Sequence, residues 1–130
     1  MEVDLIADDS LAAELAIMAA EAIDDKKGTD VTLLDVSEIL RIVDVFVIAT
    51  GTNRRQVQAL ADAVEERLRD LGRRPLRVEG RSEAEWALLD YGDIVVHLFQ
   101  PAVREFYSLE RLWGDAPKLE WNPTPVSDTA

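Results

Sequence analysis

Residues 79–99 read EGRSEAEWALLDYGDIVVHLF, and this stretch decides the fold. It holds two strand-like apolar runs, Trp86–Leu89 and Ile94–Phe99, on either side of the short turn Asp90–Asp93. Aromatic and β-branched runs that flank an Asp- and Gly-containing turn are typical of a β-hairpin. We therefore predict a hairpin in the C-terminal half of the chain.

Trp86 is the most informative residue of this hairpin. Indole combines a large contact area with one hydrogen-bond donor, so tryptophan is common both in cores and at protein interfaces. Trp86 and Leu88 share one face of their strand, opposite Ala87 and Leu89, and one of these faces must pack on a helix. If the Trp86 face is open, it is a binding patch; the hairpin alone leaves both interpretations open.

A β-α-β unit is expected upstream of the hairpin. Val45–Thr50 is a continuous apolar run, typical of a strand that is covered on both faces. A helix with apolar residues at helical spacing follows between Asn53 and Gly72, and Leu76–Glu79 then alternates as a strand. We expect these two strands to run parallel, joined by a right-handed crossover.

The remaining elements complete one α/β domain. A helix is expected to begin at the cap residues Asp8–Ser10 and to end at Gly28, and a strand at Val31–Val36 follows it. Pro101 suits the first turn of a last helix. The inner side of that helix is expected to carry Val103, Phe106, Leu109 and Trp113.

The predicted architecture is a mixed, mostly parallel five-stranded sheet, packed by about three helices. A chain of 130 residues supports one such domain. We place the domain at residues 1–114 and expect the proline-containing tail 115–130 to be extended or disordered, with Leu119 and Trp121 as its tethering residues.

Composition excludes several classes of site. The chain has no cysteine and one histidine, which excludes disulfides, thiolate catalysis and His-rich or Cys-based metal sites. No apolar run reaches about 18 residues and the first residues lack a basic signal region, so we expect a cytoplasmic protein with no membrane partner. The net charge of −12 favours a basic protein partner over nucleic acid, although basic residues gather at 54–55, 67–77 and 104–111.

The loop between the buried strand and the following helix is a second candidate site. Free helix N–H groups and two arginines meet there, so an anion or phosphate could bind at Gly51, Thr52, Arg54 and Arg55. The loop lacks the Lys-Ser/Thr ending of a P-loop and the three glycines of a dinucleotide fingerprint. An ordinary capped helix start explains the same residues.

Four carboxylates of the hairpin region, Glu83, Glu85, Asp90 and Asp93, invite a catalytic or metal-binding interpretation. Asp90 and Asp93 bracket a turn, where aspartate is favoured for backbone hydrogen bonding. His97 alternates with strand residues, and no nucleophile at a suitable spacing accompanies it. We predict no catalytic residue, no metal site and no cofactor.

Taken together, the motifs resemble those of the RsfS/Iojap family of ribosomal silencing factors. The resemblance runs from the first helix to about Trp113. It rests on the order and spacing of these segments: Leu34–Ser37, Asp44–Gly51, Arg55 with Val57, Glu79–Gly80, Trp86–Asp93, His97–Phe99 and Arg104–Trp113. Gln56 stands where the family often has histidine, and Glu85 precedes Trp86 where a small residue is common.

The resemblance implies a translational repressor and not an enzyme. Such a protein binds large-subunit ribosomal protein fourteen on the large ribosomal subunit and sterically blocks joining of the small subunit. It also implies a nucleotidyltransferase-like topology without the catalytic residues, and a homodimer when free. The implied partner-binding residues are Trp86, Leu88, Asp90, Tyr91, Asp93, His97, Glu79 and Glu83.

One alternative function stays open. The loop Gly51–Arg55 on this fold class is compatible with a nucleotide-binding or nucleotidyltransferase-like enzyme. The acidic groups around Trp86 and Leu88 instead suit a basic ribosomal protein, and steric blocking needs no catalytic group.

Overall fold

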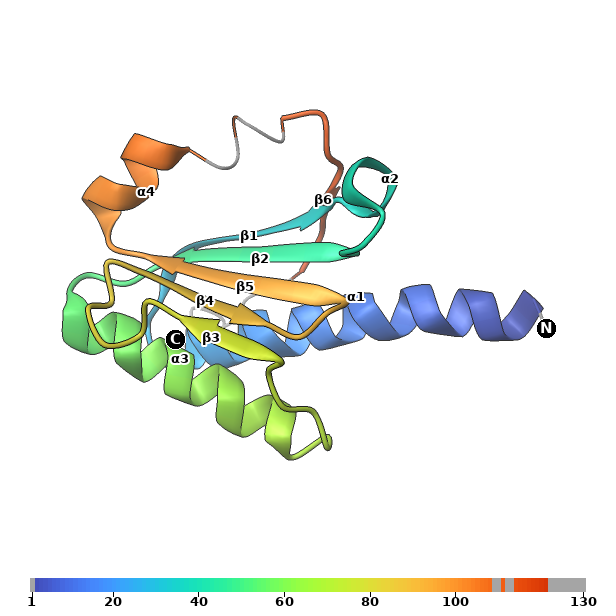
Figure 1. Ribbon diagram of the computed structural model, residues 1–130, viewed down its shortest axis with the longest axis horizontal. Coiled ribbons are helices and arrows are strands. Elements are labelled where there is room, and N and C mark those ends of the chain that lie inside the picture. Colours follow the sequence, from blue (N-terminus) through green and yellow to red (C-terminus); the bar gives the residue numbers. More distant parts are fainter. Residues whose placement is uncertain (1, 109–110, 112–113, 122–130) are drawn as a thin grey trace, which may run out of the picture.

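A computed structural model describes residues 2–108, 111 and 114–121 of the chain. Four helices and six strands lie along these residues, and three of the strands follow one another directly (Figure 1). In chain order they are α1 (Glu2–Asp25), β1 (Thr29–Asp35), α2 (Ser37–Leu40), β2 (Val45–Thr50), α3 (Arg54–Arg69), β3 (Arg77–Glu79), β4 (Trp86–Asp90), β5 (Ile94–Phe99), α4 (Pro101–Tyr107) and β6 (Lys118–Leu119).

The predicted hairpin is confirmed as β4 and β5, which pair in antiparallel register. Trp86 lies opposite Phe99, Leu88 opposite His97, and Asp90 opposite Val95. The side chains of alternate residues therefore share one face of the sheet, as the sequence pattern predicts. This register places Trp86 and His97 on the same face.

The predicted parallel sheet is wrong in strand number and direction. In the part of the chain that the structure describes, six strands lie in the order β3-β4-β5-β2-β1-β6. Only β2 and β5 of these strands pair in parallel, and the other pairings are antiparallel. β3 does not adjoin β2, because the hairpin of β4 and β5 lies between them. Burial explains the order: β5 is buried at every residue and needs a central place, whereas β3 is exposed at every residue and suits an edge.

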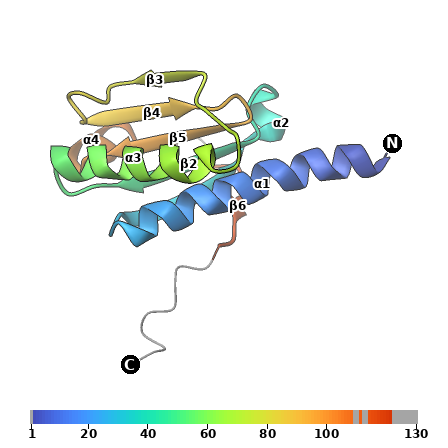
Figure 2. The same ribbon diagram turned by 90° about the horizontal axis from the view of Figure 1, so that it is seen from below.

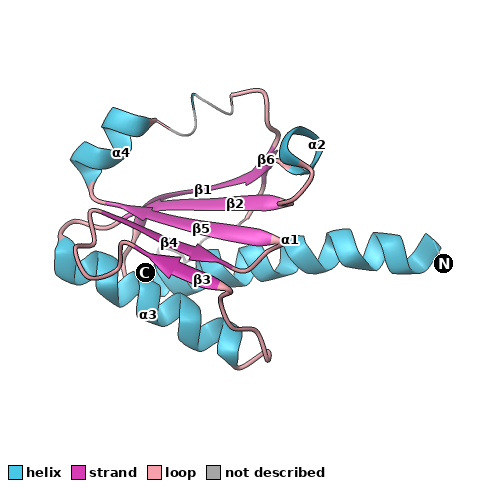
Figure 3. Ribbon diagram, viewed as in Figure 1, coloured by secondary structure: helices cyan, strands magenta, loops and turns pink. Residues whose placement is uncertain are grey.

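Helices α1 and α3 cover one face of the sheet (Figures 2 and 3). Alanines of α1 are fully buried against this face, and their small side chains let the helix approach the strands closely. Leu60, Val64 and Leu68 of α3 complete the same core. Leu11 of α1 is 48% exposed.

The opposite face of the sheet has a smaller cluster with less cover. Val103 of α4, Leu40 of α2 and Ala116 pack against it at its periphery. Arg104 fastens α4 to the sheet, since its guanidinium donates to the Thr50 hydroxyl at 2.8 Å and to the Asp30 carbonyl at 2.5 Å. This less covered face carries the Trp86 side of the hairpin.

The ends of the chain differ from the prediction. α1 begins at Glu2, so the expected caps Asp8–Ser10 lie inside the helix, where the apolar helix formers before them extend it. α4 ends at Tyr107, and Phe106, expected on its inner side, is 79% exposed, whereas Val103 packs against the sheet. Leu109 and Trp113 lie outside the described residues.

Part of the predicted tail belongs to the sheet. Lys118–Leu119 pairs with β1 as its sixth strand, and the Trp121 indole donates to the Val31 carbonyl at 3.5 Å. Leu119 therefore tethers the tail as part of an added edge strand, and Trp121 tethers it through this hydrogen bond. Among the described residues, no helix combines the length and the apolar character needed to cross a membrane.

Candidate protein-binding site on the hairpin face

Three strands bring four rings together on the less covered face of the sheet. Phe46 of β2 meets His97 of β5 edge-on, with ring centroids 4.7 Å apart. Trp86 of β4 lies against Phe99 at 4.9 Å, as the cross-strand register requires. Aromatic pairs in such arrangements add to the energy of area burial. We call Phe46, Trp86, His97 and Phe99 the aromatic cluster.

His97 is a neutral, structural member of this cluster. The Trp86 indole N–H donates to His97 Nδ1 at 3.2 Å, so Nδ1 is unprotonated and the ring proton resides on Nε2. Burial lowers the pKa of His97 to about 4, although the nearby Asp90 carboxylate acts in the opposite direction. Within the described residues, Nε2 is buried without a hydrogen-bond partner.

The low pKa of His97 predicts a pH-dependent stability. Below pH 6.5 the unfolded chain takes up the histidine proton before the folded chain does, so stability from this residue falls between pH 6.5 and about pH 4. The loss is about 3 kcal/mol across this window. Urea unfolding of wild type and His97→Asn at several pH values measures it, since the asparagine oxygen keeps an acceptor for Trp86 and does not titrate. Parallel pH profiles of the two proteins would contradict the assignment.

A hollow of about 250 Å³ opens beside the cluster. Trp86 and Leu88, both half-buried, line it together with Glu79 and Gly80 of the neighbouring edge strand. His97 is only 5% exposed and therefore supports Trp86 from below. The accessible apolar part of the face is thus the indole and the leucine, and the histidine lies behind them.

One acidic side chain, Glu79, lines this hollow. Glu79 carries an exposed carboxylate 3.2 Å from the Arg77 guanidinium, which also lies 3.6 Å from Asp90. Glu83 is exposed in the loop before β4. The structure therefore brings Trp86, Leu88 and Glu79 into one surface, and Asp90 shares their face of the sheet.

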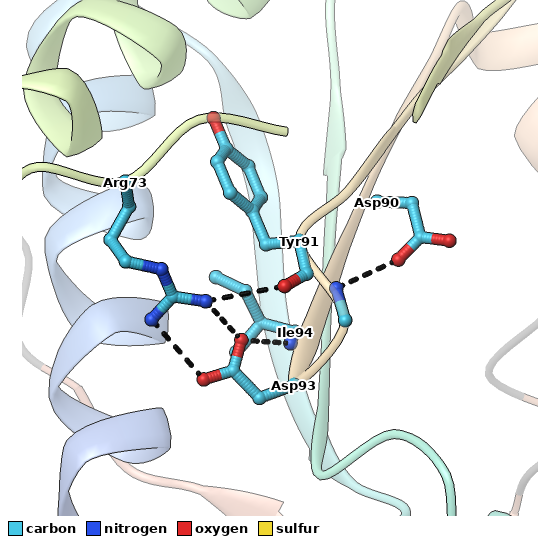
Figure 4. Close-up of polar contacts among 6 residues, drawn as sticks. Arg73, Asp90, Tyr91, Asp93 and Ile94 are labelled. Atoms are coloured by element: carbon cyan, nitrogen blue, oxygen red, sulfur yellow. Dashed lines mark hydrogen bonds and ion pairs between the residues drawn. The ribbon is translucent and has the colours of Figure 1, made fainter. Parts of the chain in front are cut away.

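Two predicted site residues lie elsewhere. Tyr91 is 3% exposed in the core beneath the helices, and burial, with a smaller effect of the Glu65 charge, raises its pKa to about 12. Asp93 faces Arg73, with Nη2 and Oδ1 2.8 Å apart, and it also accepts from the Ile94 N–H (Figure 4). Both residues stabilise the turn of the hairpin from the helix side, so the structure does not place them with Trp86.

Asp90, the remaining predicted aspartate, has a structural role in the turn. Asp90 accepts a hydrogen bond from the Gly92 N–H at 2.8 Å, and Gly92 has a φ of 93° (Figure 4). This is the backbone role that aspartate has before a glycine in tight turns.

The glycine loop before α3 is occupied by its own capping contacts. The Asn53 side chain accepts from the Gln56 N–H at 2.9 Å, and the Gln56 side chain accepts from the Thr52 N–H. A Cβ at Gly51 would press on Val57 at 2.8 Å, so close helix-to-strand packing accounts for this glycine. Arg54 and Arg55 are exposed. The capping explanation of this loop is therefore sufficient.

Sequence reasoning missed three residues of the hairpin face. Phe46 joins the cluster through the parallel pairing of β2 with β5, and no local pattern reveals that pairing. Phe99 joins it through the hairpin register, which places Phe99 opposite Trp86. Gly80 has a φ of 74° and lies against the Trp86 carbonyl. In the sequence, a glycine directly after a short strand, as in Glu79–Gly80, indicates a place where another backbone segment approaches closely.

Comparison with known proteins identifies the family. The family described as "Ribosomal silencing factor during starvation" (RsfS) matches residues 9–130. A ribosomal silencing factor RsfS from Halalkalibacterium halodurans is 43% identical over 107 residues, covering 82% of this chain and 92% of the relative. The chloroplastic protein Iojap of Zea mays is 33% identical over 116 residues, covering 87% of this chain and 49% of the relative.

The fold leads to the same family. A crystal structure of a Chromobacterium violaceum protein superposes with a TM-score of 0.77 at 37% sequence identity, covering 91% of this chain and 98% of that protein. Sequence and fold thus agree over nearly the whole domain, and the chain belongs to the RsfS family of ribosomal silencing factors.

Proposed function

We propose that this protein represses translation by binding the large ribosomal subunit through ribosomal protein fourteen and by sterically blocking the small subunit. Membership of the RsfS family supports the assignment to ribosome silencing. The observation that carries the mode of binding is the hollow at Trp86 and Leu88, beside the carboxylate of Glu79. An apolar centre with a polar rim is the usual anatomy of a protein interface.

Charge complementarity supports a basic protein as the partner. The chain has 26 acidic and 14 basic residues, and the exposed groups Glu79 and Glu83 lie on or next to the hairpin edge. Opposite potentials steer encounter and reject wrong partners. A basic ribosomal protein meets both requirements, since it offers positive charge and aliphatic side chains to the indole.

The mode of action is steric, which explains why the site contains a buried, neutral histidine in place of a reactive group. A protein bound on the joining face of the large subunit excludes the small subunit by volume alone. This action takes place in the cytoplasm, where translation occurs, and consumes no substrate or cofactor.

When no ribosome is bound, the same face suits self-association. Trp86 and Leu88 are accessible apolar groups next to the edge strand β3, and such surfaces favour dimers. We therefore propose a homodimer of the free protein. The nucleotidyltransferase-like topology stays a prediction, and the alternative enzyme function at Gly51–Arg55 has weaker support because the capping contacts already explain that loop.

Cross-linking tests the proposed partner. The chain has no cysteine, so a photoreactive probe can be attached to Glu79→Cys beside the hollow. Illumination on purified large subunits is expected to yield a product with ribosomal protein fourteen. Ala59→Cys, exposed on α3 on the opposite face, is the matched control and is expected to give little of it. Equal products from both positions, or a different protein, would contradict the proposal.

A further inference from the structure

Residues 67–77 form a basic segment in an acidic protein. They include five arginines and one aspartate, a net charge of +4, whereas the whole chain has a net charge of −12. The segment spans the end of α3, the turn at Gly72 and the start of β3. In Figure 1 this connection between α3 and β3 lies at the β3 edge of the sheet.

Three of these arginines are neutralised by intramolecular ion pairs. Arg67 lies 3.1 Å from Asp25 of α1, Arg73 2.8 Å from Asp93, and Arg77 3.2 Å from Glu79. The first two contacts have structural roles, because they join α3 to α1 and the α3–β3 connection to the hairpin. Arg77 also lies 3.6 Å from Asp90 of β4.

Arg69 and Arg74 differ from the other three. Both are exposed, and within the described part of the chain neither has a carboxylate partner. They line one hollow of about 470 Å³ with Arg73, Pro75 and Glu65. Glu65 lies 2.8 Å from Arg81, which also pairs with Asp62, and Arg73 is paired with Asp93. The lining of the hollow therefore holds three arginines and one glutamate, an excess of positive charge.

Helix capping accounts for only part of this arrangement. Arg69 is in the last turn of α3, where a cation interacts favourably with the helix dipole. Arg74 follows the turn at Gly72 and lies outside the helix, so this explanation does not apply to it. Both guanidinium groups line the same hollow without a carboxylate partner among the described residues, and this arrangement points to an external anion.

We propose that Arg69 and Arg74 bind the phosphate backbone of ribosomal RNA when the protein docks on the large subunit. The proposal rests on the proposed function, which places the Trp86 hollow on a ribosomal protein surrounded by RNA. β3 connects the two surfaces, because Glu79 at one end of this strand lines the Trp86 hollow and Arg74 lies just before its other end. Guanidinium groups bind phosphate through paired hydrogen bonds.

The chemistry of the hollow predicts binding without base recognition. Its lining contains no aromatic side chain on which a base could stack. Contacts of arginine with phosphate give affinity that is independent of sequence and that weakens with salt. The arginines thus add electrostatic attraction and orientation to the protein contact made by Trp86.

The test measures affinity for purified large subunits as the KCl concentration rises. The variant Arg69→Gln/Arg74→Gln is compared with wild type and with Arg54→Gln/Arg55→Gln, which removes the same charge from the opposite end of α3. We expect the first variant to bind about 10-fold more weakly at low salt, with a slope of log K against log salt reduced by about 1 to 2. The Arg54/Arg55 control should keep the slope of the wild type.

A photoreactive probe at Arg74→Cys identifies the molecule in contact. An RNase-sensitive adduct supports the proposal, whereas an adduct with protein alone overturns it. Equal slopes and affinities for all three proteins would also overturn it. If Trp86→Ala weakens binding but the Arg69/Arg74 variant does not, only this inference fails. If wild type does not bind large subunits at all, the proposed function fails with it.

Discussion

Replacing Trp86 with alanine is expected to weaken binding to the large ribosomal subunit by about 2 kcal/mol or more, roughly 30-fold. The indole lies against Phe99, donates to His97 and lines the accessible hollow with Leu88. Truncation to alanine therefore removes the apolar contact surface of the indole and also the N–H group that holds the ring in place. Equilibrium binding of labelled protein to purified subunits measures the loss.

Two control variants separate binding from folding in this experiment. Trp86→Phe keeps a ring against Phe99 but loses the N–H donor to His97, so we expect an intermediate affinity. Ile42→Ala removes a large apolar side chain that is 80% exposed and outside the hollow, and its affinity should equal that of wild type. A folded Trp86→Ala protein with wild-type affinity would remove Trp86 from the interface.

Gly80→Ala is expected to have the second large effect, a loss of about 3 kcal/mol in the free energy of unfolding. Gly80 has a φ of 74°, which L-residues adopt at a cost, and an added Cβ would overlap the carbonyl oxygen of Trp86. Neighbouring backbone cannot move aside cheaply, so the loop or β4 must shift. Urea unfolding measures the change.

Gly72→Ala is the matched control for this prediction. Gly72 has a φ of 80°, but a Cβ there would meet no atom within 4 Å. This variant bears only the conformational cost, about 1 kcal/mol. Equal losses from the two substitutions would show that contact with the Trp86 carbonyl is unimportant.

Local patterns in the sequence predicted the elements that depend on neighbouring residues. The hairpin, the cap at Asn53 and the stop at Gly72 all follow from turn and capping chemistry within a few residues. Alternation also placed Trp86 and Leu88 on one face of their strand, and the hairpin register adds His97 to that face. The surface at the centre of the candidate site was therefore accessible to sequence reasoning.

Long-range pairing was the source of the errors. A β-α-β pattern suggests adjacent parallel strands, but the hairpin inserts beside β2, so β3 moves to the edge. Burial likewise depends on elements distant in sequence: Tyr91 reads as a hairpin residue but lies under α3, where it contributes to the core. Sequence spacing contains no information on which helix covers which face.

The most direct test of steric silencing is the rate and extent of subunit joining. Purified large subunits are incubated with the protein, small subunits are added, and association is followed by light scattering and sedimentation. Wild type should reduce joining and sediment with the large subunit, and Trp86→Ala should restore joining at the same concentration. Undiminished joining on matched ribosomes that are saturated with the protein would contradict the account.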